Sequence, residues 1–139
     1  MFAEALVCLA LNVYHEARDQ PFIGQVAVAQ VVMNRVHDDR YPDDACDVVY
    51  QGPTYSWKPD FPVRHRCQFS WYCDGKSDKT PDEDAWQQAL MIALGVHTGE
   101  IEDFVEGATH YHASYVLPEW AESKTPIVQI GQHMFYRWE

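Results

Sequence analysis

Glu16 is the residue whose type and position best suit catalysis. It follows Leu9 by seven positions and Val13 by three, so a helix would place its carboxyl group on their apolar face. Partial burial and the negative end of the helix dipole would both raise its pKa. A carboxyl group that keeps its proton near neutral pH can protonate the leaving oxygen of a glycosidic bond. Position alone favours a structural glutamate that caps the helix or pairs with Arg18 or His15.

Two predicted helices would hold Glu16 in place. Residues 2–17 carry apolar side chains at helical spacing, and Glu16 would lie at the end of this helix. The sequence Asp19-Gln20-Pro21 then ends it, because a proline pushes the preceding residue out of the helical region. Residues 23–36 are apolar nearly all round, which predicts a buried central helix.

The middle of the chain predicts shorter elements. A short helix is expected within residues 43–50, followed by an irregular loop over the glycine- and proline-containing residues 51–62. Residues 67–71 alternate between apolar and polar side chains, which predicts a short strand or an extended segment. Residues 74–77, Asp-Gly-Lys-Ser, indicate a turn.

The last part of the chain predicts a helix and a hairpin. In residues 80–83, Thr-Pro-Asp-Glu, the threonine is the expected cap and the proline the first helical position. This helix should end near Gly95 or Gly99. Residues 127–136 read as two short strands joined by a Gly-Gln turn, which predicts a β-hairpin. The fold class is therefore α+β, a single domain over residues 1–139 that is mainly helical with a small β-hairpin.

Size and charge exclude several functions. Acidic residues outnumber basic ones 21 to 10, giving a formal net charge of −11, which opposes binding to nucleic acid or to an anionic membrane surface. No apolar run approaches the roughly 18 to 20 residues of a membrane span. A length of 139 residues suits one compact domain. We expect a monomer, with neither a nucleic-acid partner nor membrane insertion.

The four cysteines are Cys8, Cys46, Cys67 and Cys73. Four cysteines allow three complete pairings, and the sequence does not choose among them. Cys67 and Cys73 are close enough to close a short loop in an oxidising compartment. Zinc binding is less favoured than a structural role, because the spacing contains no C-x-x-C pair.

Several blocks of sequence resemble one enzyme family in order and spacing. They are NVYHEAR (12–18), GQVAVA (24–29), VMNRV (32–36), CDVVY (46–50), CQFS (67–70), GATHY (107–111) and IGQHMFY (130–136). Together they resemble the SleB-type cell-wall hydrolases, which are the spore-cortex-lytic enzymes and their bacterial and phage relatives. The resemblance spans almost the whole chain.

The resemblance implies a lysozyme- or transglycosylase-like fold that cuts the bond between N-acetylmuramic acid and N-acetylglucosamine in peptidoglycan. It also implies that Glu16 is catalytic, because the glutamate of the family's Tyr-x-Glu-Ala-Arg motif falls at this position. One departure follows the motif. The family usually has Gly-Glu there, and this chain has Asp19-Gln20, so the second acid of the motif is missing.

The missing acid bears on the reaction. A two-carboxylate hydrolase needs a partner for Glu16, but Asp60, Asp74 and Asp103 lie in loop-like segments where we expect them to be solvated. A lytic transglycosylase needs one carboxyl group, because the 6-hydroxyl of muramic acid attacks in place of water. We therefore expect a lytic transglycosylase in which Glu16 is both acid and base.

Two of the matching blocks are the expected contacts to the glycan, since amides and hydroxyls orient sugar substituents and aromatic faces stack on the rings. These contacts are Gln68, Phe69 and Ser70 in one block, and Thr109, His110 and Tyr111 in the other. Tyr14 and Trp120 are weaker candidates. For Phe69 and Tyr111, ordinary core packing is an equally good interpretation.

Other readings stay open from the sequence. The enzyme could be a hydrolytic muramidase, or a zinc amidase built on His15 and the pair His110 and His112, although the H-E-x-x-H motif is absent and we expect no metal or cofactor. It could also be a wall-binding module without activity. We expect action on the cell wall, at its periplasmic or extracellular face. The chain start lacks a signal peptide, which suits a phage lysin made in the cytoplasm or an excised domain.

Overall fold

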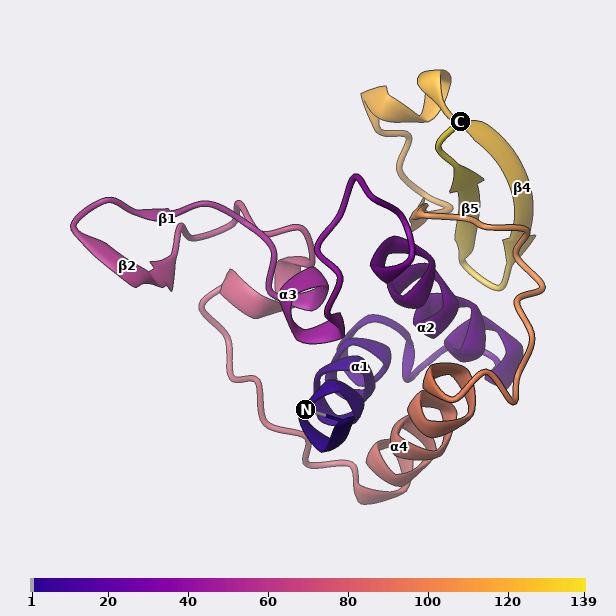
Figure 1. The fold of residues 1–139 in the computed structure, drawn as a ribbon, viewed down its shortest axis with the longest axis horizontal. Coiled ribbons are helices and arrows are strands. Elements are labelled where there is room, and N and C mark those ends of the chain that lie inside the picture. The colour runs from indigo at the N-terminus through magenta and orange to yellow at the C-terminus, as the bar shows by residue number, and fades with distance from the viewer. Residues whose placement is uncertain (1) are drawn as a thin grey trace.

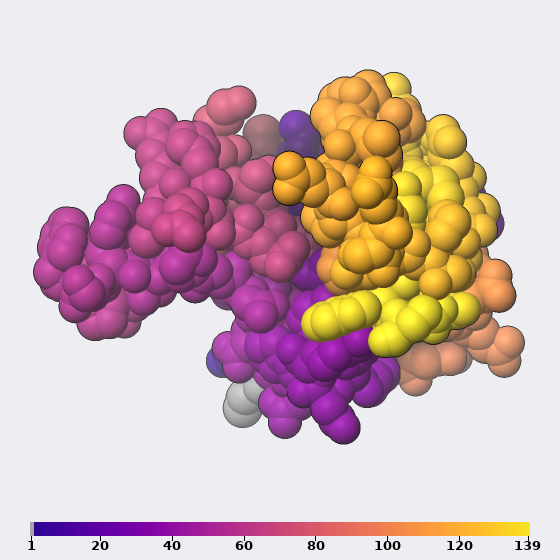
Figure 2. Space-filling model, turned by 90° about the horizontal axis from the view of Figure 1, so that it is seen from above, coloured from indigo at the N-terminus to yellow at the C-terminus, as the bar shows by residue number. Residues whose placement is uncertain are grey.

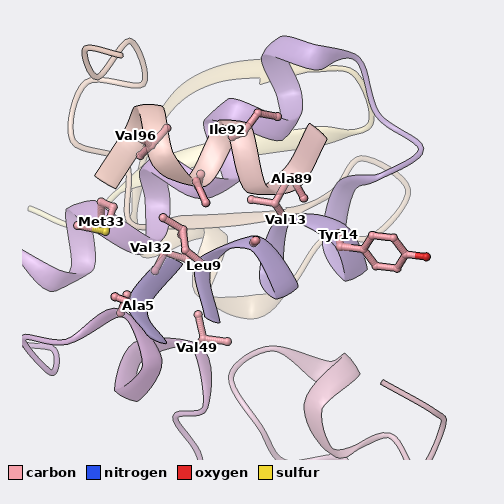
Figure 3. Close-up of a cluster of buried hydrophobic side chains, with 14 of the residues drawn as sticks. Ala5, Leu9, Val13, Tyr14, Val32, Met33, Val49, Ala89, Ile92 and Val96 are labelled. Carbon is pink, nitrogen blue, oxygen red and sulfur yellow. The ribbon is translucent and has the colours of Figure 1, made fainter. Parts of the chain in front are cut away.

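The computed structural model describes residues 2–139, and three helices form the body of the fold (Figure 1). They are α1 (Phe2–Ala17), α2 (Phe22–Val36) and α4 (Glu83–His97). Their apolar faces meet in one core, where α1 supplies Leu9 and Val13, α2 supplies Val32, and α4 supplies Ile92 (Figure 3). These four side chains are almost fully buried. The helix predicted over residues 2–17 is confirmed.

The all-round apolar character of α2 has a simple cause, because this helix lies between two cores. Val26, Ala29, Val32 and Met33 face the core shared with α1 and α4. Ala27, Val28 and Val31 of α2 face a second core, which also contains Ala17, Val105, Ala108 and Phe135. The prediction of a buried central helix is therefore confirmed.

A three-stranded antiparallel sheet covers the second core. Its strand order is β3 (His110–Ala113), β5 (His133–Arg137), β4 (Thr125–Ile130), and the turn that joins β4 to β5 contains Gly131 with φ +57°. The predicted hairpin is thus confirmed and gains β3 as a third strand. A 3-10 helix, η2 (Glu119–Ser123), lies in the connection from β3 to β4.

The segment between α2 and α4 corrects two predictions. The short helix α3 (Ala45–Val49) is present, and the Asp44 side chain caps it. Residues 51–62, expected to be irregular, contain the hairpin strands β1 (Thr54–Tyr55) and β2 (Lys58–Pro62), which project from the body (Figure 1). Residues 67–71 do not form a strand. A 3-10 helix, η1 (Ser70–Cys73), begins there, because a disulfide bond between residues six positions apart curls the chain.

The start of α4 also differs from the prediction. The cap is Asp82, whose side chain accepts a hydrogen bond from the Ala85 backbone amide, and not Thr80. An aspartate is as good a cap as a threonine, and here it leaves residues 80 and 81 outside the helix. The helix ends at His97, and Gly99 follows with φ +82°, which agrees with the predicted end.

Two disulfide bonds choose one of the three possible pairings. Cys8 pairs with Cys46, which joins α1 to α3, and Cys67 pairs with Cys73. No cysteine in the described chain is therefore free to bind zinc as a thiolate. Between Phe2 and Glu139, every helix is too short or too polar to cross a membrane.

Candidate active site

Glu16 lies in the last turn of α1, where three other elements meet. Its carboxyl group is close to Arg35 from α2 and Tyr111 from β3, and Tyr111 in turn packs near Phe69, with ring centres 6.5 Å apart. Figure 2 shows a hollow between the pink segment around residues 60–75 and the orange segment around residues 110–120. We call this hollow the groove. Phe69 lies within the first of these segments and Tyr111 within the second.

The surroundings of Glu16 favour its protonated form. Burial raises the pKa of this carboxyl group from its ordinary 4.5 to about 7. The Tyr111 hydroxyl and the positive charge of Arg35 oppose this rise, and burial outweighs both. A carboxyl group with a pKa near neutrality can both donate and accept a proton near pH 7.

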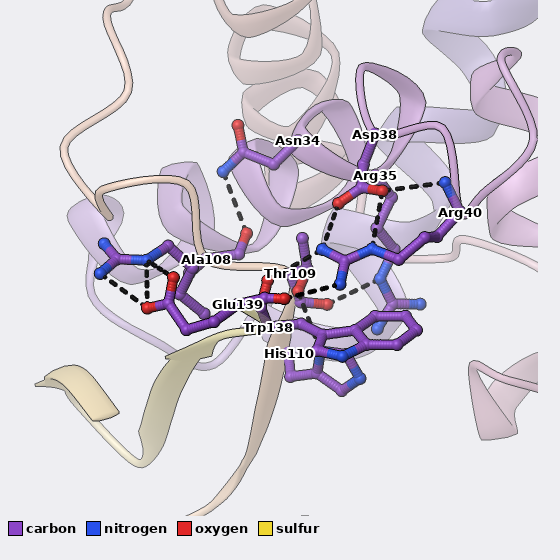
Figure 4. A network of polar contacts seen from close by, with 10 residues as sticks. Asn34, Arg35, Asp38, Arg40, Ala108, Thr109, His110, Trp138 and Glu139 are labelled. Atoms are coloured by element: carbon purple, nitrogen blue, oxygen red, sulfur yellow. Dashed lines mark hydrogen bonds and ion pairs between the residues drawn. The ribbon is translucent and has the colours of Figure 1, made fainter. Parts of the chain in front are cut away.

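Arg35 is buried although it carries a charge. Only 2% of its surface is exposed, and its Nε atom donates a hydrogen bond of 2.7 Å to the Thr109 carbonyl oxygen (Figure 4). Its guanidinium group lies 4.9 Å from the ring centre of Tyr41 and 5.3 Å from that of Phe69. Arg35 therefore connects α2 to both sides of the groove through Thr109 and Phe69.

Three buried polar groups beside Glu16 lack a full complement of hydrogen bonds within residues 2–139. They are Nδ2 of Asn12, Nη1 of Arg35 and the Tyr111 hydroxyl. The Tyr111 hydroxyl is near enough to Glu16 and Asn12 to influence proton binding, yet no hydrogen bond of good geometry joins them. Unsatisfied buried donors are rare in native proteins and call for an explanation. Three of them around one carboxyl group fit a site that completes its hydrogen bonds with a substrate.

Trp71 packs beside this cluster and is hydrogen-bonded to Asn12. The Trp71 indole donates a hydrogen bond of 2.9 Å to Asn12 Oδ1, and both side chains are buried. The His15 ring stacks on Trp71 at 4.6 Å, and its Nε2 donates to the Asp78 carbonyl oxygen. These contacts fix α1 against η1, and so fix one side of the groove relative to Glu16.

Asn12 and Arg35 were not among the sequence-based candidates. Asn12 lies four positions before Glu16 on the same helix face, and a polar residue among apolar neighbours is the signal that could have identified it. Arg35 gave a weaker signal, because a basic residue in the last turn of a helix is expected from the helix dipole alone.

The expected glycan contacts divide into exposed and buried side chains. Gln68 and Ser70 are exposed, whereas Phe69 and Thr109 are buried. The hydroxyl of Thr109 is already hydrogen-bonded to His110 Nδ1 at 3.0 Å.

His110 and Tyr111 are the half-buried members of this set. The His110 ring lies against Trp120, and burial together with the charge of Arg35 lowers its pKa to about 4. It is therefore neutral near pH 7.

The alternative partners of Glu16 are engaged elsewhere. Arg18 donates to the Tyr14 carbonyl oxygen and lies 4.7 Å above the Tyr14 ring, while the Tyr14 hydroxyl accepts from the Asp82 amide. Within residues 2–139, no three side chains of the types that bind zinc come together. His112 instead hydrogen-bonds to the Tyr136 hydroxyl at 2.8 Å.

The position of the missing second acid has a structural use in this chain. The side-chain Oε1 of Gln20 accepts a hydrogen bond of 2.9 Å from the backbone amide of Gln132. The side-chain Nε2 of Gln20 donates one of 3.1 Å to Gln132 Oε1. Gln20 therefore ties the turn after α1 to the turn between β4 and β5. An uncharged amide suits this reciprocal pair because it supplies a donor and an acceptor.

Comparison with known proteins agrees with this geometry. A sequence model described as Cell Wall Hydrolase matches residues 19–136, which contain Arg35, Phe69 and Tyr111 and begin just after Glu16. The chain is 34% identical over 128 residues to a spore cortex-lytic enzyme of Halalkalibacterium halodurans, and 28% identical over 127 residues to one of Bacillus subtilis. Each alignment covers 91% of this chain but 33% and 35% of the relatives. The chain thus spans about a third of their length.

Solved structures extend the comparison to the fold. The catalytic domain of the germination-specific lytic transglycosylase SleB from Bacillus anthracis matches with a TM-score of 0.71 and 28% identity, over 96% of this chain and 93% of that one. The catalytic domain of the Bacillus cereus SleB protein matches with a TM-score of 0.65 and 28% identity, over 96% and 91% of the two chains. The α+β class predicted from the sequence pattern is confirmed, and the chain belongs to the Cell Wall Hydrolase family.

Proposed function

We propose that this protein cleaves the glycan strand of peptidoglycan between N-acetylmuramic acid and N-acetylglucosamine as a lytic transglycosylase, with Glu16 as its only acid and base. The observation that carries the proposal is the environment of Glu16. Its pKa is raised to about 7 by burial, and the side chains that act on it are a hydroxyl and a guanidinium group, not a second carboxylate. This environment supports a one-carboxylate mechanism.

The reaction balances with one carboxyl group. Glu16 donates its proton to the O4 atom of N-acetylglucosamine as the bond from that oxygen to C1 of N-acetylmuramic acid breaks. The C6 hydroxyl oxygen of the same muramic acid then bonds to C1 and gives its proton to the Glu16 carboxylate. The products are a free 4-hydroxyl and a 1,6-anhydromuramic end, and Glu16 regains its proton without consuming water.

Arg35 and Tyr111 have complementary roles in this proposal. When Glu16 gives up its proton, a negative charge forms in a poorly solvated place. The guanidinium group of Arg35 and the hydroxyl of Tyr111 both favour that charged form. They keep the pKa near neutrality, where one group can act in turn as acid and base.

Side-chain exposure refines the proposed glycan contacts. Gln68 and Ser70 are exposed and can reach sugar substituents directly, and His110 and Tyr111 are half-buried on the opposite side. Phe69 and Thr109 are buried, so we assign them the role of holding these neighbours through Arg35. The proposed place of action is the cell wall, in line with the relatives named spore cortex-lytic enzymes, and we propose that the protein acts as a monomer.

The proposal is tested by digestion of purified peptidoglycan. Wild-type protein should release fragments that end in 1,6-anhydromuramic acid, identified by mass spectrometry. Glu16→Gln should abolish release, because an amide cannot donate or accept the proton, and the exposed Glu122→Gln serves as the matched control. Reducing muramic ends would indicate a hydrolase, and freed stem peptides an amidase. Full activity of the Glu16→Gln variant would contradict the assignment of the acid.

A further inference from the structure

The β1–β2 hairpin carries large aromatic side chains that the fold does not use. Trp57 is 72% exposed and Phe61 is 53% exposed. The Tyr55 ring lies 5.3 Å from that of Trp57, and the Lys58 ammonium group lies 4.3 Å from the ring centre of Phe61. Both strands pair only with each other, and Figure 1 shows the hairpin reaching away from the helices. Exposed apolar clusters of this kind mark sites of interaction.

The hairpin is firmly attached to one side of the groove. The Val63 amide donates to the Pro53 carbonyl oxygen at 2.9 Å, which closes the base of the hairpin. The backbone amide of Gln68 donates to the backbone carbonyl oxygen of Gln51 at 2.9 Å, which joins the base of the hairpin to the segment before η1. The base of the hairpin therefore lies beside Gln68, one of the proposed glycan contacts.

The charge of this region is opposite to that of the whole chain. Residues 51–67 contain Lys58, Arg64 and Arg66 against Asp60, although the chain as a whole carries −11. The three basic side chains are exposed. Peptidoglycan combines sugar rings, whose C–H faces stack on aromatic side chains, with the carboxylates of its peptide stems. Aromatic and basic side chains together fit such a polymer better than either type alone.

We propose that the β1–β2 hairpin is a second binding surface for the glycan strand, on which Trp57 and Phe61 stack against sugar rings and Lys58 binds a stem-peptide carboxylate. This inference rests on the proposed function, because it takes peptidoglycan as the substrate. The surface would hold a long strand beyond the cleaved bond and leave short fragments unaffected.

The first test measures binding without cleavage. Glu16→Gln protein is pelleted with purified peptidoglycan, alone and combined with Trp57→Ala and Phe61→Ala. The hairpin substitutions should raise the apparent Kd about tenfold, which corresponds to about 1.4 kcal/mol. The matched control is Met91→Ala with Phe22→Ala, two side chains that are 73% and 57% exposed on α4 and α2. This control should bind like its parent.

A second test uses active protein and separates the two proposals. The hairpin variant should release fragments more slowly from long strands, with an unchanged rate on a tetrasaccharide that is too short to reach the hairpin. Equal binding and equal release by the variant and its parent would overturn the hairpin proposal and leave the proposed function intact. Wild-type protein that neither binds purified peptidoglycan nor releases fragments from it would overturn both. A change in oligomeric state, seen by light scattering, would instead make the hairpin an interface between copies and overturn the proposal.

Discussion

Replacing Glu16 with glutamine should stabilise the protein, and the size of this effect should depend on pH. In the folded chain, burial raises the pKa of this carboxyl group from 4.5 to about 7. The unfolded chain leaves it in water, at its ordinary pKa. Below pH 4.5 both states hold the proton, so ionisation contributes nothing to stability. As the pH rises from 4.5 to 7, the unfolded state ionises first and the wild type loses stability.

The magnitude follows from the two pKa values. Each pH unit between them contributes about 1.4 kcal/mol, so the loss approaches about 3 kcal/mol above pH 7. The glutamine side chain does not ionise and avoids this loss. For a domain of this length, about 3 kcal/mol corresponds to roughly 10 °C in Tm. The variant should therefore melt about 10 °C higher than the wild type at pH 8, while the two should nearly coincide at pH 4.5.

Thermal unfolding of both proteins across pH 4.5 to 8, with the disulfides intact, measures this difference. The matched control is Glu122→Gln, which neutralises an exposed carboxylate and should show no comparable pH-dependent gain. Equal stability of wild type and Glu16→Gln at pH 8 would refute the claim that Glu16 is desolvated. A gain of the same size at every pH would show that packing, and not ionisation, is its source.

Three further predictions follow from the same structure. Tyr111→Phe removes a hydroxyl that favours the Glu16 carboxylate, so the alkaline limb of the pH–activity profile should move to higher pH; an unmoved limb would mean that the two groups do not interact. Burial lowers the pKa of His110 to about 4, so the wild type should lose stability as the pH falls from 6.5 to 4. The His110→Phe variant should not show this loss, which should be on the order of 2 kcal/mol. Urea unfolding of both proteins at pH 7 and pH 4.5 measures the difference. The Cys8–Cys46 bond joins residues 38 positions apart, so it restricts the unfolded chain. Replacing both cysteines with alanine should lower the free energy of unfolding by about 4 kcal/mol in the same urea assay. A decrease below about 1 kcal/mol would contradict the loop-entropy argument.

The helices could be predicted from the sequence because local pattern and tertiary burial agree in them. In α1 and α2 the apolar residues repeat at helical spacing, and the structure buries those same side chains. Residues 67–71 and 51–62 could not be predicted in the same way. The first segment is shaped by the Cys67–Cys73 bond, whose pairing the sequence leaves open. The second forms a hairpin with no core-facing side, so it has no burial pattern to read.

In the candidate active site, one residue could be proposed from the sequence and another only from the contacts of the folded chain. Glu16 could be proposed from the sequence because the Tyr-x-Glu-Ala-Arg motif of the resembling family falls on it, whereas its position on an apolar helix face did not by itself favour catalysis over a structural role. Arg35 could not, because nothing in the sequence distinguishes a buried guanidinium group from one in the solvated last turn of a helix. Only the folded chain places it between Phe69 and Thr109, one from each side of the groove.

This placement supports the proposed mechanism, in which one acid serves without a partner carboxylate. A second carboxylate would raise the pKa of Glu16 further, by repulsion between like charges. With burial, Tyr111 and Arg35 together the pKa is already about 7, so an additional rise would leave the group protonated and unable to act as a base. Arg35 and Tyr111 act in the opposite sense and hold the pKa near neutrality. A single carboxyl group that must both give and take a proton needs donors around it, and Asn12, Arg35 and Tyr111 each place an unsatisfied polar group there.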